Sequence, residues 1–227
     1  MLRAVSLSDS SILVVVPVFN GEQSILQLHT ALTQIDIGQL LVIDDGSIDA
    51  TAKILNDNGI PHLSHKTNLG KGAAIKSGAK WAFENNFHWI LTLDADQQHP
   101  PSAIPVFMER MRERVILIGL RTDLKSMPLL RVFSNKFTSL LLSIRTNNLL
   151  RDSQCGFRLI PLSLFKEVTF KQNGFQFESE LLIKASYSNY TIEHVNIPTV
   201  YGLEKSAMRN IYDTVKFAVM YFNSYIW

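Results

Sequence analysis

The stretch ILTLDADQQHPP, residues 90–101, passes directly from an apolar run into two aspartates and a polar turn. Short apolar runs that end in turn residues are typical of buried strands. The same pattern recurs at 12–16, 40–43 and 115–120, which run into PVFNG, DDGS and an arginine. We therefore predict buried strands at all of these places, each ending in polar side chains.

Helical patterns separate these strands, and strands that alternate with helices imply a parallel sheet with helices on both faces. No linker rich in glycine, proline or serine divides the chain, so we predict an α/β fold with a Rossmann-like, mostly parallel sheet in a single domain. The predicted helices span 22–34, 48–58, 70–85, 101–113, 129–144, 176–187 and the chain from about 206, and further strands span 156–160 and 190–198.

The composition is that of a globular protein with a sizeable core. Hydrophobic residues make up 46% of the 227 residues and charged residues 19%, which excludes a disordered or collagen-like chain. A net charge of +2 argues against a nucleic-acid binder, and a single cysteine, Cys155, suits a reducing compartment. Because no signal segment and no window of ~18 apolar residues is found, we expect a cytoplasmic protein that at most lies on a membrane.

One stretch of the chain is strongly basic. From Arg121 to Arg158 there are seven lysines and arginines against two aspartates, which gives this stretch +5 and the rest of the chain −3. A local contact with phosphate or anionic lipid explains such a stretch, and so does a solvated helix face. The charge alone leaves both interpretations open.

Acidic side chains follow several of the predicted strands. Ligands of open α/β sheets bind at the carboxyl ends of the strands, where Glu22, Asp44 and Asp45 are expected to meet Asp94 and Asp96. Carboxylates this close repel one another unless a cation or hydrogen-bond donors lie among them. The pair Asp94 and Asp96, with the amide of Gln98 two residues on, suits a hard divalent cation. For Asp44 and Asp45 a plain turn with a helix cap is the alternative.

Four stretches of the first half stand in a characteristic order: VVVPVFNGE (14–22), VIDDGSIDAT (42–51), NLGKGAAIKSGAKWA (68–82) and LDADQQHPP (93–101). Together they resemble the family 2 glycosyltransferases with the GT-A fold. The second half contains RTDLKSMPLLRVFSNK (121–136), DSQCGFRLIP (152–161), FQFESELLIKA (175–185) and YGLEKS (201–206), and these are similar to the dolichyl- and polyprenyl-phosphate sugar synthases. The likeness covers about residues 12–206. We accordingly expect a glycosyltransferase domain over 1–206 and a C-terminal amphipathic helix over 207–227.

The resemblance implies a nucleotide-sugar donor, either GDP-mannose-like or a UDP-sugar, and Mg²⁺ or Mn²⁺ as cofactor. It assigns the metal to Asp94, Asp96 and Gln98. It assigns the donor to Pro17, Phe19, Glu22, Asp45, Asp94, Ala95 and Lys205. Family members often carry glutamate where Gly21 stands, and Glu22 next to it is the expected substitute. An arginine common in the family six positions before Lys205 is Thr199 here.

For the acceptor, the resemblance implies a polyprenyl- or dolichyl-phosphate lipid, an inverting transfer, and Asp96, Arg121 and Arg131 as catalytic groups. Arg131 and Ser134 match the acceptor-phosphate site, and Arg121 matches an arginine near the diphosphate. A phosphate acceptor needs no general base, since its second pKa is about 6. A sugar hydroxyl would need one, and Glu178 and Glu180 are then the candidates.

Two other functions stay open. The same fold can act on a hydroxyl of a glycan acceptor. Alternatively, the chain can be a non-catalytic nucleotide-sugar-binding or membrane-docking protein, which is consistent with Gly21 and Thr199 standing where the family often has glutamate and arginine. Several side chains are expected to be structural instead: Lys71 solvated, His99 on the surface or in a turn, and Cys155 a packed small side chain.

Two helices bear on a membrane contact. Phe133, Phe137, Leu140, Leu141 and Ile144 form an apolar stripe that is more often part of a core, and Ile211, Val215, Val219 and Phe222 form another. For the C-terminal stripe, which has aromatic residues around it, an interfacial helix and a core helix are equally compatible. A lipid acceptor favours peripheral contact at the cytoplasmic face of the membrane, with a separate membrane subunit as a further partner.

Overall fold

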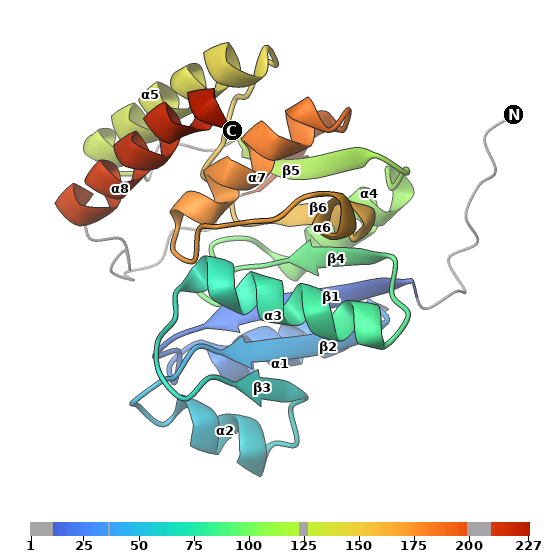
Figure 1. Ribbon diagram of the computed structural model, residues 1–227. Coiled ribbons are helices and arrows are strands. Elements are labelled where there is room, and N and C mark those ends of the chain that lie inside the picture. The colour runs from blue at the N-terminus through green and yellow to red at the C-terminus, as the bar shows by residue number, and fades with distance from the viewer. Residues whose placement is uncertain (1–10, 36, 123–126, 199–209) are drawn as a thin grey trace, which may run out of the picture.

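A seven-stranded sheet forms the centre of the computed structural model, which describes residues 11–35, 37–122, 127–198 and 210–227 (Figure 1). The strand order in this described part is β3-β2-β1-β4-β6-β5-β7. The strands are β1 (Ile12–Val18), β2 (Gln39–Asp44), β3 (His62–Ser64), β4 (Trp89–Thr92), β5 (Val115–Arg121), β6 (Arg158–Pro161) and β7 (Thr191–Ile197).

The helices alternate with the strands along most of the chain. They are α1 (Ile25–Thr33), α2 (Thr51–Asp57), α3 (Lys71–Glu84), α4 (Ile104–Glu109), α5 (Leu129–Thr146), α6 (Ser163–Glu167), α7 (Gln176–Tyr187) and α8 (Asn210–Asn223), with short 3₁₀ turns at Pro101–Ala103 and Ser224–Ile226. Among the described residues, no helix is both long enough and apolar enough to cross a membrane.

One strand runs against the others. β1 pairs in parallel with β2 and β4, β2 with β3, and β5 with β7. β6 is antiparallel to both β4 and β5, so β5 runs in the same direction as β4. The predicted mostly parallel sheet is therefore confirmed, and its reversed strand, β6, was not predicted.

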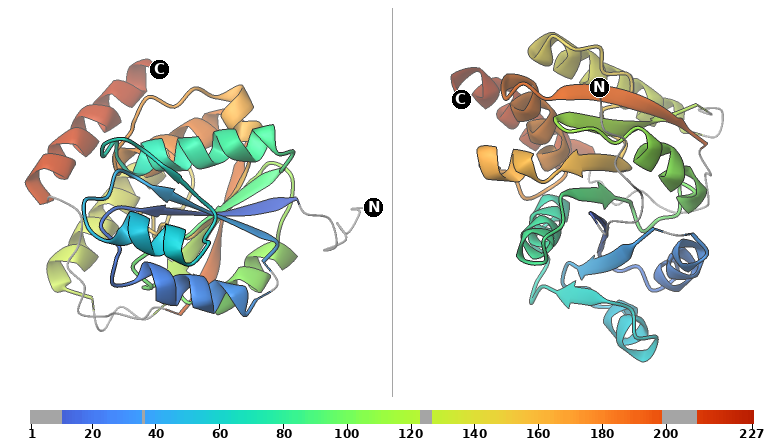
Figure 2. Two further views of the ribbon diagram at one scale, coloured as in Figure 1. Left: turned by 90° about the horizontal axis from the view of Figure 1, so that it is seen from below. Right: turned by 90° about the vertical axis from the view of Figure 1, so that its right-hand side faces the viewer.

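Helices cover both faces of the sheet, as predicted. Figure 2 shows α3 on one face and α1 and α4 on the other. α3 approaches β1 closely because its inner face carries mostly glycine and alanine: a β-carbon on Gly78 would lie 2.5 Å from Cγ1 of Val15. This close approach fixes the beginning of α3 near the carboxyl edge of the sheet.

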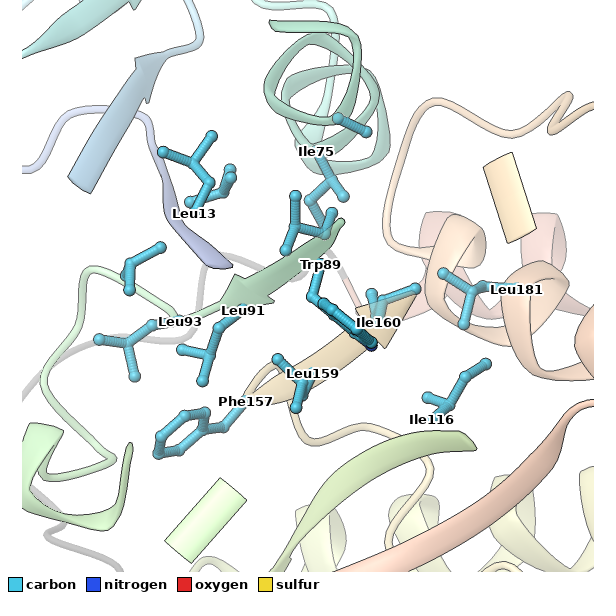
Figure 3. Packing of buried hydrophobic residues seen from close by; sticks show 14 of the residues in the cluster. Leu13, Ile75, Trp89, Leu91, Leu93, Ile116, Phe157, Leu159, Ile160 and Leu181 are labelled. Carbon is cyan, nitrogen blue, oxygen red and sulfur yellow. The ribbon is translucent and has the colours of Figure 1, made fainter. Parts of the chain in front are cut away.

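The core joins both halves of the sheet through β4 and β6. Side chains from β1, α3, β4, β6 and α7 meet there (Figure 3), and Leu13, Leu91 and Leu181 are completely buried. Burying a leucine contributes about 1.5–3 kcal/mol. The apolar runs of the sequence thus supply the stability that holds the polar turns at the edge.

The differences from the predicted elements are local. β3 and α6 were not predicted, and the expected helix at 101–113 is a 3₁₀ turn followed by the short α4. β3 spans three residues at the edge of the sheet, and only one of them, Leu63, is apolar. Edge strands this short carry too little periodicity to be read from a sequence.

Candidate functional site

The polar turns of the sequence meet at the carboxyl edge of the sheet. β1, β2, β4 and β5 all end there because they run in the same direction. β6 runs the other way, so the loop of residues 152–157 that precedes it reaches the same edge. The site therefore draws on strand ends from both halves of the sheet.

The loop after β1 is hydrogen-bonded to the loop after β2. Oδ1 of Asn20 accepts from the N–H of Ile48 at 2.9 Å, and Oε2 of Glu22 accepts from the N–H of Ala50 at 2.9 Å. Glu22, predicted to contact the donor, thus braces the neighbouring loop and remains exposed. These bonds hold the two turns in a fixed relation.

Two further residues predicted at the donor site lie in or beside β1. Pro17 is buried within the strand, in register with Ile43 of β2. The ring of Phe19 is 46% exposed just beyond the strand, and its predicted contact with the nucleotide base remains a prediction. Asp44, at the end of β2, accepts a hydrogen bond from the N–H of Ser47 at 3.0 Å, which is the turn role given as an alternative.

Asp45 organises the segment that leads into α3. Its carboxylate accepts from the N–H groups of Leu69 at 3.0 Å and Gly70 at 2.7 Å. Nδ1 of His65 lies 2.6 Å from the same carboxylate, and the other ring nitrogen lies 2.9 Å from Oγ of Ser77. Asp45 is 3% exposed. The predicted contact of Asp45 with the nucleotide base remains a prediction.

The aspartate turn, residues 94–98, follows β4. Oδ1 of Asp96 accepts from the N–H of Gln98 at 3.1 Å, and the side chain of Gln97 donates to the backbone of Ser24 at 3.0 Å. Asp94, Ala95 and Asp96 are half-buried, and Gln98 is buried. The turn is thus tied both to itself and to the start of α1.

Lys71, expected to be solvated, instead lies inside the site, so that expectation was wrong. Its Nζ is 2.6 Å from Oδ1 of Asp94 and 2.8 Å from Oε1 of Glu178, and the side chain is 14% exposed. Burial alone would lower the pKa of Lys71, but the charges and hydrogen bonds of the two carboxylates outweigh it and raise that pKa. Lys71 is therefore the ammonium that balances the buried carboxylates.

The same ion pair lowers the pKa of Asp94. Burial would raise the pKa of Asp94, but the neighbouring ammonium of Lys71 holds it below its ordinary value. Asp94 is consequently ionised at neutral pH and forms an ion pair with the ammonium of Lys71.

The side chains of the aspartate turn fit a hard divalent cation. Asp94 and Asp96 offer carboxylate oxygens, Gln98 offers an amide oxygen, and the ammonium on Asp94 shows that a cation is accommodated there. Among the described residues, no group of three or more histidines, cysteines, aspartates and glutamates gathers to hold a metal. The donor atoms of this turn suit such a cation but are too few to surround it, and a metal site at the turn remains a prediction.

Arg121 ends β5 in a buried ion pair that the sequence did not predict. Its Nε lies 2.7 Å from Oδ2 of Asp152, and its Nη2 lies 2.8 Å from Oδ1. Asn135 donates to the same carboxylate at 2.9 Å, and both charged side chains are 3% exposed. Burial would raise the pKa of Asp152, but the bonds from Arg121 keep it low. The guanidinium is held rigidly at the sheet edge.

The residues predicted for the acceptor phosphate lie on α5. Arg131 is half-buried and Ser134 is exposed. A small pocket between the end of β5 and α5 is lined by Arg121 but not by these two residues. Its lining is Leu120, Arg121, Met127, Val132, Asn135, Lys136, Arg151 and Asp152. Lys205 and Thr199 lie outside the described residues.

Two buried polar side chains that the sequence analysis missed flank the loop before β6. His99, expected on the surface or in a turn, lies in the segment after β4; it is 3% exposed, and its Nε2 lies 3.6 Å from Sγ of Cys155. Burial lowers the pKa of His99 to about 4, so its ring is neutral at pH 7. Arg158 is 1% exposed and donates to the backbone oxygens of Cys155, Ser153 and Glu178. An arginine within the apolar run CGFRLIP was the available signal.

The two glutamates considered as general bases have different surroundings. Glu180 is fully buried, and its carboxylate accepts from the N–H groups of Lys171 and Gln172 and pairs with Lys184 at 2.8 Å. It is a structural acceptor within α7. Glu178 is the one that reaches the site, where it contacts Lys71.

An apolar surface extends over α5 and α8, which lie side by side in Figure 1. The α5 stripe was expected to be core, but most of it is exposed, so that interpretation was wrong; only Leu141 packs on the core. Arg145 of α5 bonds to Ser224 and joins the ends of the two helices. We call the following exposed residues the α5–α8 surface: Leu129, Phe133, Phe137, Leu140, Ile144, Tyr212, Val215, Val219, Phe222, Tyr225, Ile226 and Trp227.

The chain matches known proteins over most of its length. The model of the family described as "Glycosyl transferase family 2" matches residues 13–173. A UDP-N-acetylglucosamine–dolichyl-phosphate N-acetylglucosaminyltransferase of Methanococcus voltae is 27% identical over 95% of this chain and 95% of its own length. An undecaprenyl-phosphate 4-deoxy-4-formamido-L-arabinose transferase of Salmonella paratyphi B is 30% identical over 64% of this chain and 47% of its own.

The fold also matches solved structures. Glucosyl-3-phosphoglycerate synthase from Mycobacterium tuberculosis, crystallised with Mn²⁺ and UDP-glucose, superposes with a TM-score of 0.75 over 99% of this chain and 84% of that one. At 18% identity this likeness concerns the fold. With the family match and the strand-end geometry, it leads to one conclusion: the chain belongs to glycosyl transferase family 2 and is a glycosyltransferase with the GT-A fold.

Proposed function

We propose that this glycosyltransferase moves a sugar, with inversion, from a nucleoside diphosphate to a polyprenyl-phosphate lipid, and that it requires Mg²⁺ or Mn²⁺. The observation that carries the proposal is the aspartate turn at the carboxyl edge, where Asp94 already pairs with the ammonium of Lys71. Two relatives named above act, by their names, on dolichyl phosphate and undecaprenyl phosphate.

In this proposal Asp94, Asp96 and Gln98 hold the divalent cation. When bound, such an ion supplies Lewis-acid stabilisation of the charge that develops on a departing diphosphate. The donor lies across the same edge: Pro17 and Phe19 border the base, Glu22 and Asp45 face the nucleoside, and Ala95 gives the sugar room beside the two aspartates. Lys205 adds a positive charge near the diphosphate.

The acceptor side uses cations and no general base. An alkyl phosphate is largely dianionic at neutral pH, so its oxygen attacks without losing a proton. Arg121 is held at the sheet edge by Asp152 and acts near the diphosphate, and Arg131 with Ser134 on α5 receives the acceptor phosphate. The positive segment 121–158 surrounds this side of the site.

A hydroxyl acceptor on a glycan is the alternative, and Glu178 decides between the two. Its carboxylate lies between Lys71 and the guanidinium of Arg158, 3.8 Å away, and is therefore engaged with cations. This placement favours the phosphate acceptor, since a hydroxyl needs a carboxylate free to take its proton.

We further propose that the α5–α8 surface contacts the cytoplasmic face of the membrane that contains the lipid acceptor. All but Trp227 of the twelve aromatic and aliphatic side chains on this surface are more than half exposed, and such a composition is typical of an interfacial helix pair. Lys136 and Arg151 beside the pocket add positive charge for anionic lipids. A separate membrane subunit is the other partner that such a surface suits.

The test is a transfer assay with UDP- and GDP-sugars, Mn²⁺ or Mg²⁺, and dolichyl or undecaprenyl phosphate. We expect lipid-linked sugar from at least one combination, none with a chelator, and at least a ~100-fold lower rate for Asp96→Asn, the loss typical of one preorganised electrostatic contact. Asp57→Asn, on the exposed end of α2, is the control and should keep full activity. Full activity of Asp96→Asn would exclude the proposed metal site, and transfer only to a glycan hydroxyl would favour the alternative.

A further inference from the structure

The start of α3 is fixed tightly against the segment that leads into α7. Gly70 has φ +102°, and a β-carbon there would lie 2.5 Å from the backbone oxygen of Asn173. The same oxygen accepts from the N–H of Ala73 at 3.0 Å. A β-carbon on Gly72 would meet the side chain of Phe177. The backbone of Lys71, between these two glycines, is therefore positioned by packing.

This packing directs the ammonium of Lys71 between two carboxylates that belong to different halves of the site. Asp94 comes from the turn after β4, and Glu178 comes from the first turn of α7. Arg158 is a further cation near this pair, 3.8 Å from Glu178, and the ring of His99 nearby is neutral at pH 7. In this arrangement Lys71 balances the charge of Asp94.

Lys71 and a divalent ion compete for Asp94. The ammonium occupies Oδ1 of Asp94 at 2.6 Å. Two cations on one carboxylate repel each other, and they do so more strongly at a half-buried carboxylate than in bulk water. A nucleoside diphosphate brings negative charge to the edge and can take up the ammonium, after which Asp94 is free to bind the metal.

We propose that Lys71 is an exchangeable internal counter-ion, which keeps the divalent cation off Asp94 until the nucleotide diphosphate arrives. This inference rests on the proposed function and adds a binding order to it. By linkage, nucleotide and metal then strengthen each other's binding, and Lys71 contributes part of that coupling.

Isothermal titration calorimetry on the full chain tests this with Mn²⁺ alone and with Mn²⁺ in saturating UDP or GDP. We expect wild type to bind Mn²⁺ weakly alone and much more tightly with one of the nucleotides. Lys71→Met should bind Mn²⁺ alone at least ~10-fold more tightly than wild type and should show a correspondingly smaller nucleotide effect. Lys80→Met, at an exposed position of the same helix, is the matched control and should behave as wild type.

Two further measurements test whether the gain in Mn²⁺ affinity arises at Asp94 and whether Lys71→Met still folds. Adding Asp94→Asn to Lys71→Met should remove the gain in Mn²⁺ affinity. Lys71→Met should melt at a lower temperature than wild type in chelator and should gain more from Mn²⁺ alone, since the ion replaces the lost charge. Unchanged or weaker Mn²⁺ binding by Lys71→Met, with wild type still binding Mn²⁺ and nucleotide, overturns this inference alone. Absence of Mn²⁺ binding by wild type in all conditions overturns the proposed metal site as well.

Discussion

Gly156 lies directly against the carboxylate of Asp94: a β-carbon on this glycine would be 2.6 Å from Oδ1 and closer still to Oδ2. The backbone oxygen of Gly156 also accepts a hydrogen bond from Oγ1 of Thr92 at 2.8 Å, so the loop before β6 cannot simply move away. The bare backbone at this position thus determines where the carboxylate of the aspartate turn can be.

Replacing Gly156 by alanine should therefore displace Asp94. We expect transfer activity to fall by at least ~100-fold, because displacing a catalytic group by about 1 Å already has an effect of this size. Gly59→Ala provides the comparison, since nothing lies within 4 Å of the added β-carbon, although φ there is +60°. It should cost some stability and keep the activity. Normal turnover by the Gly156→Ala protein would show that the position of Asp94 does not matter for transfer.

The buried pair of Arg121 and Asp152 should dominate the stability of this edge. Asp152→Asn keeps the shape of the side chain but leaves a buried guanidinium without its countercharge, and breaking such a pair typically costs about 3–5 kcal/mol. The free energy of unfolding from urea titration measures this loss. Asp57→Asn, which breaks an exposed pair with Lys53, should cost less than ~1 kcal/mol. Equal stability losses in the two variants would contradict the assignment.

Stability should decline in mild acid because of His194 on β7. Its Nε2 accepts from the N–H of Arg151 at 3.2 Å, which requires a neutral ring. Burial lowers the pKa of His194 below 6.5, with Asp152 opposing and Arg151 and Arg158 adding to the shift. Because the folded pKa is depressed, this contribution is complete above pH 6.5 and is lost as the pH falls from 6.5 through the folded pKa.

His194→Gln offers an acceptor that does not titrate. Between pH 7.5 and 5 its melting temperature should fall less than that of wild type, while at pH 8 the two proteins should melt at similar temperatures. If the melting temperatures of the two proteins fell equally over this pH range, protonation of His194 would not destabilise the fold.

The α5–α8 surface should bind vesicles through its exposed phenylalanines. Phe133 and Phe137 are 69% and 53% exposed. Burying one phenylalanine contributes about 1.5–3 kcal/mol, so serine at both positions should weaken binding by at least ~10-fold. Flotation with vesicles of phosphatidylglycerol and phosphatidylcholine measures the binding of each variant. Ile48→Ser, at an 88% exposed position after β2, should change nothing. Equal flotation of all three proteins would exclude this surface.

The sequence predicted the elements built from its apolar runs. The runs at 12–16, 40–43, 90–93 and 115–120 correspond to β1, β2, β4 and β5, since continuous apolar character identifies a buried strand. The direction of β6 was not predictable, because an apolar strand has the same composition whichever way it runs. For that reason the sequence did not show that Gly156 would meet Asp94.

The site was predictable where one motif contains the residues and not where distant residues pair. The aspartates of the turn after β4 were identified from their position behind an apolar run. The partners of Lys71, Arg121 and His99 come from segments 23–107 residues away, and local spacing contains no signal for such pairs. A lysine between two glycines is indistinguishable in sequence from a solvated one.

The reversed strand has a consequence for how this architecture diversifies. β6 enters the sheet at the edge where β4 and β5 leave it, so the segment between α5 and β6 reaches the candidate site from the other half of the sheet than the loops after β1 and β2. The two sides join along a single seam, the β4–β6 pairing. In the proposed function this segment lies on the acceptor side, so we expect a new segment grafted there to alter acceptor specificity and to leave donor binding intact.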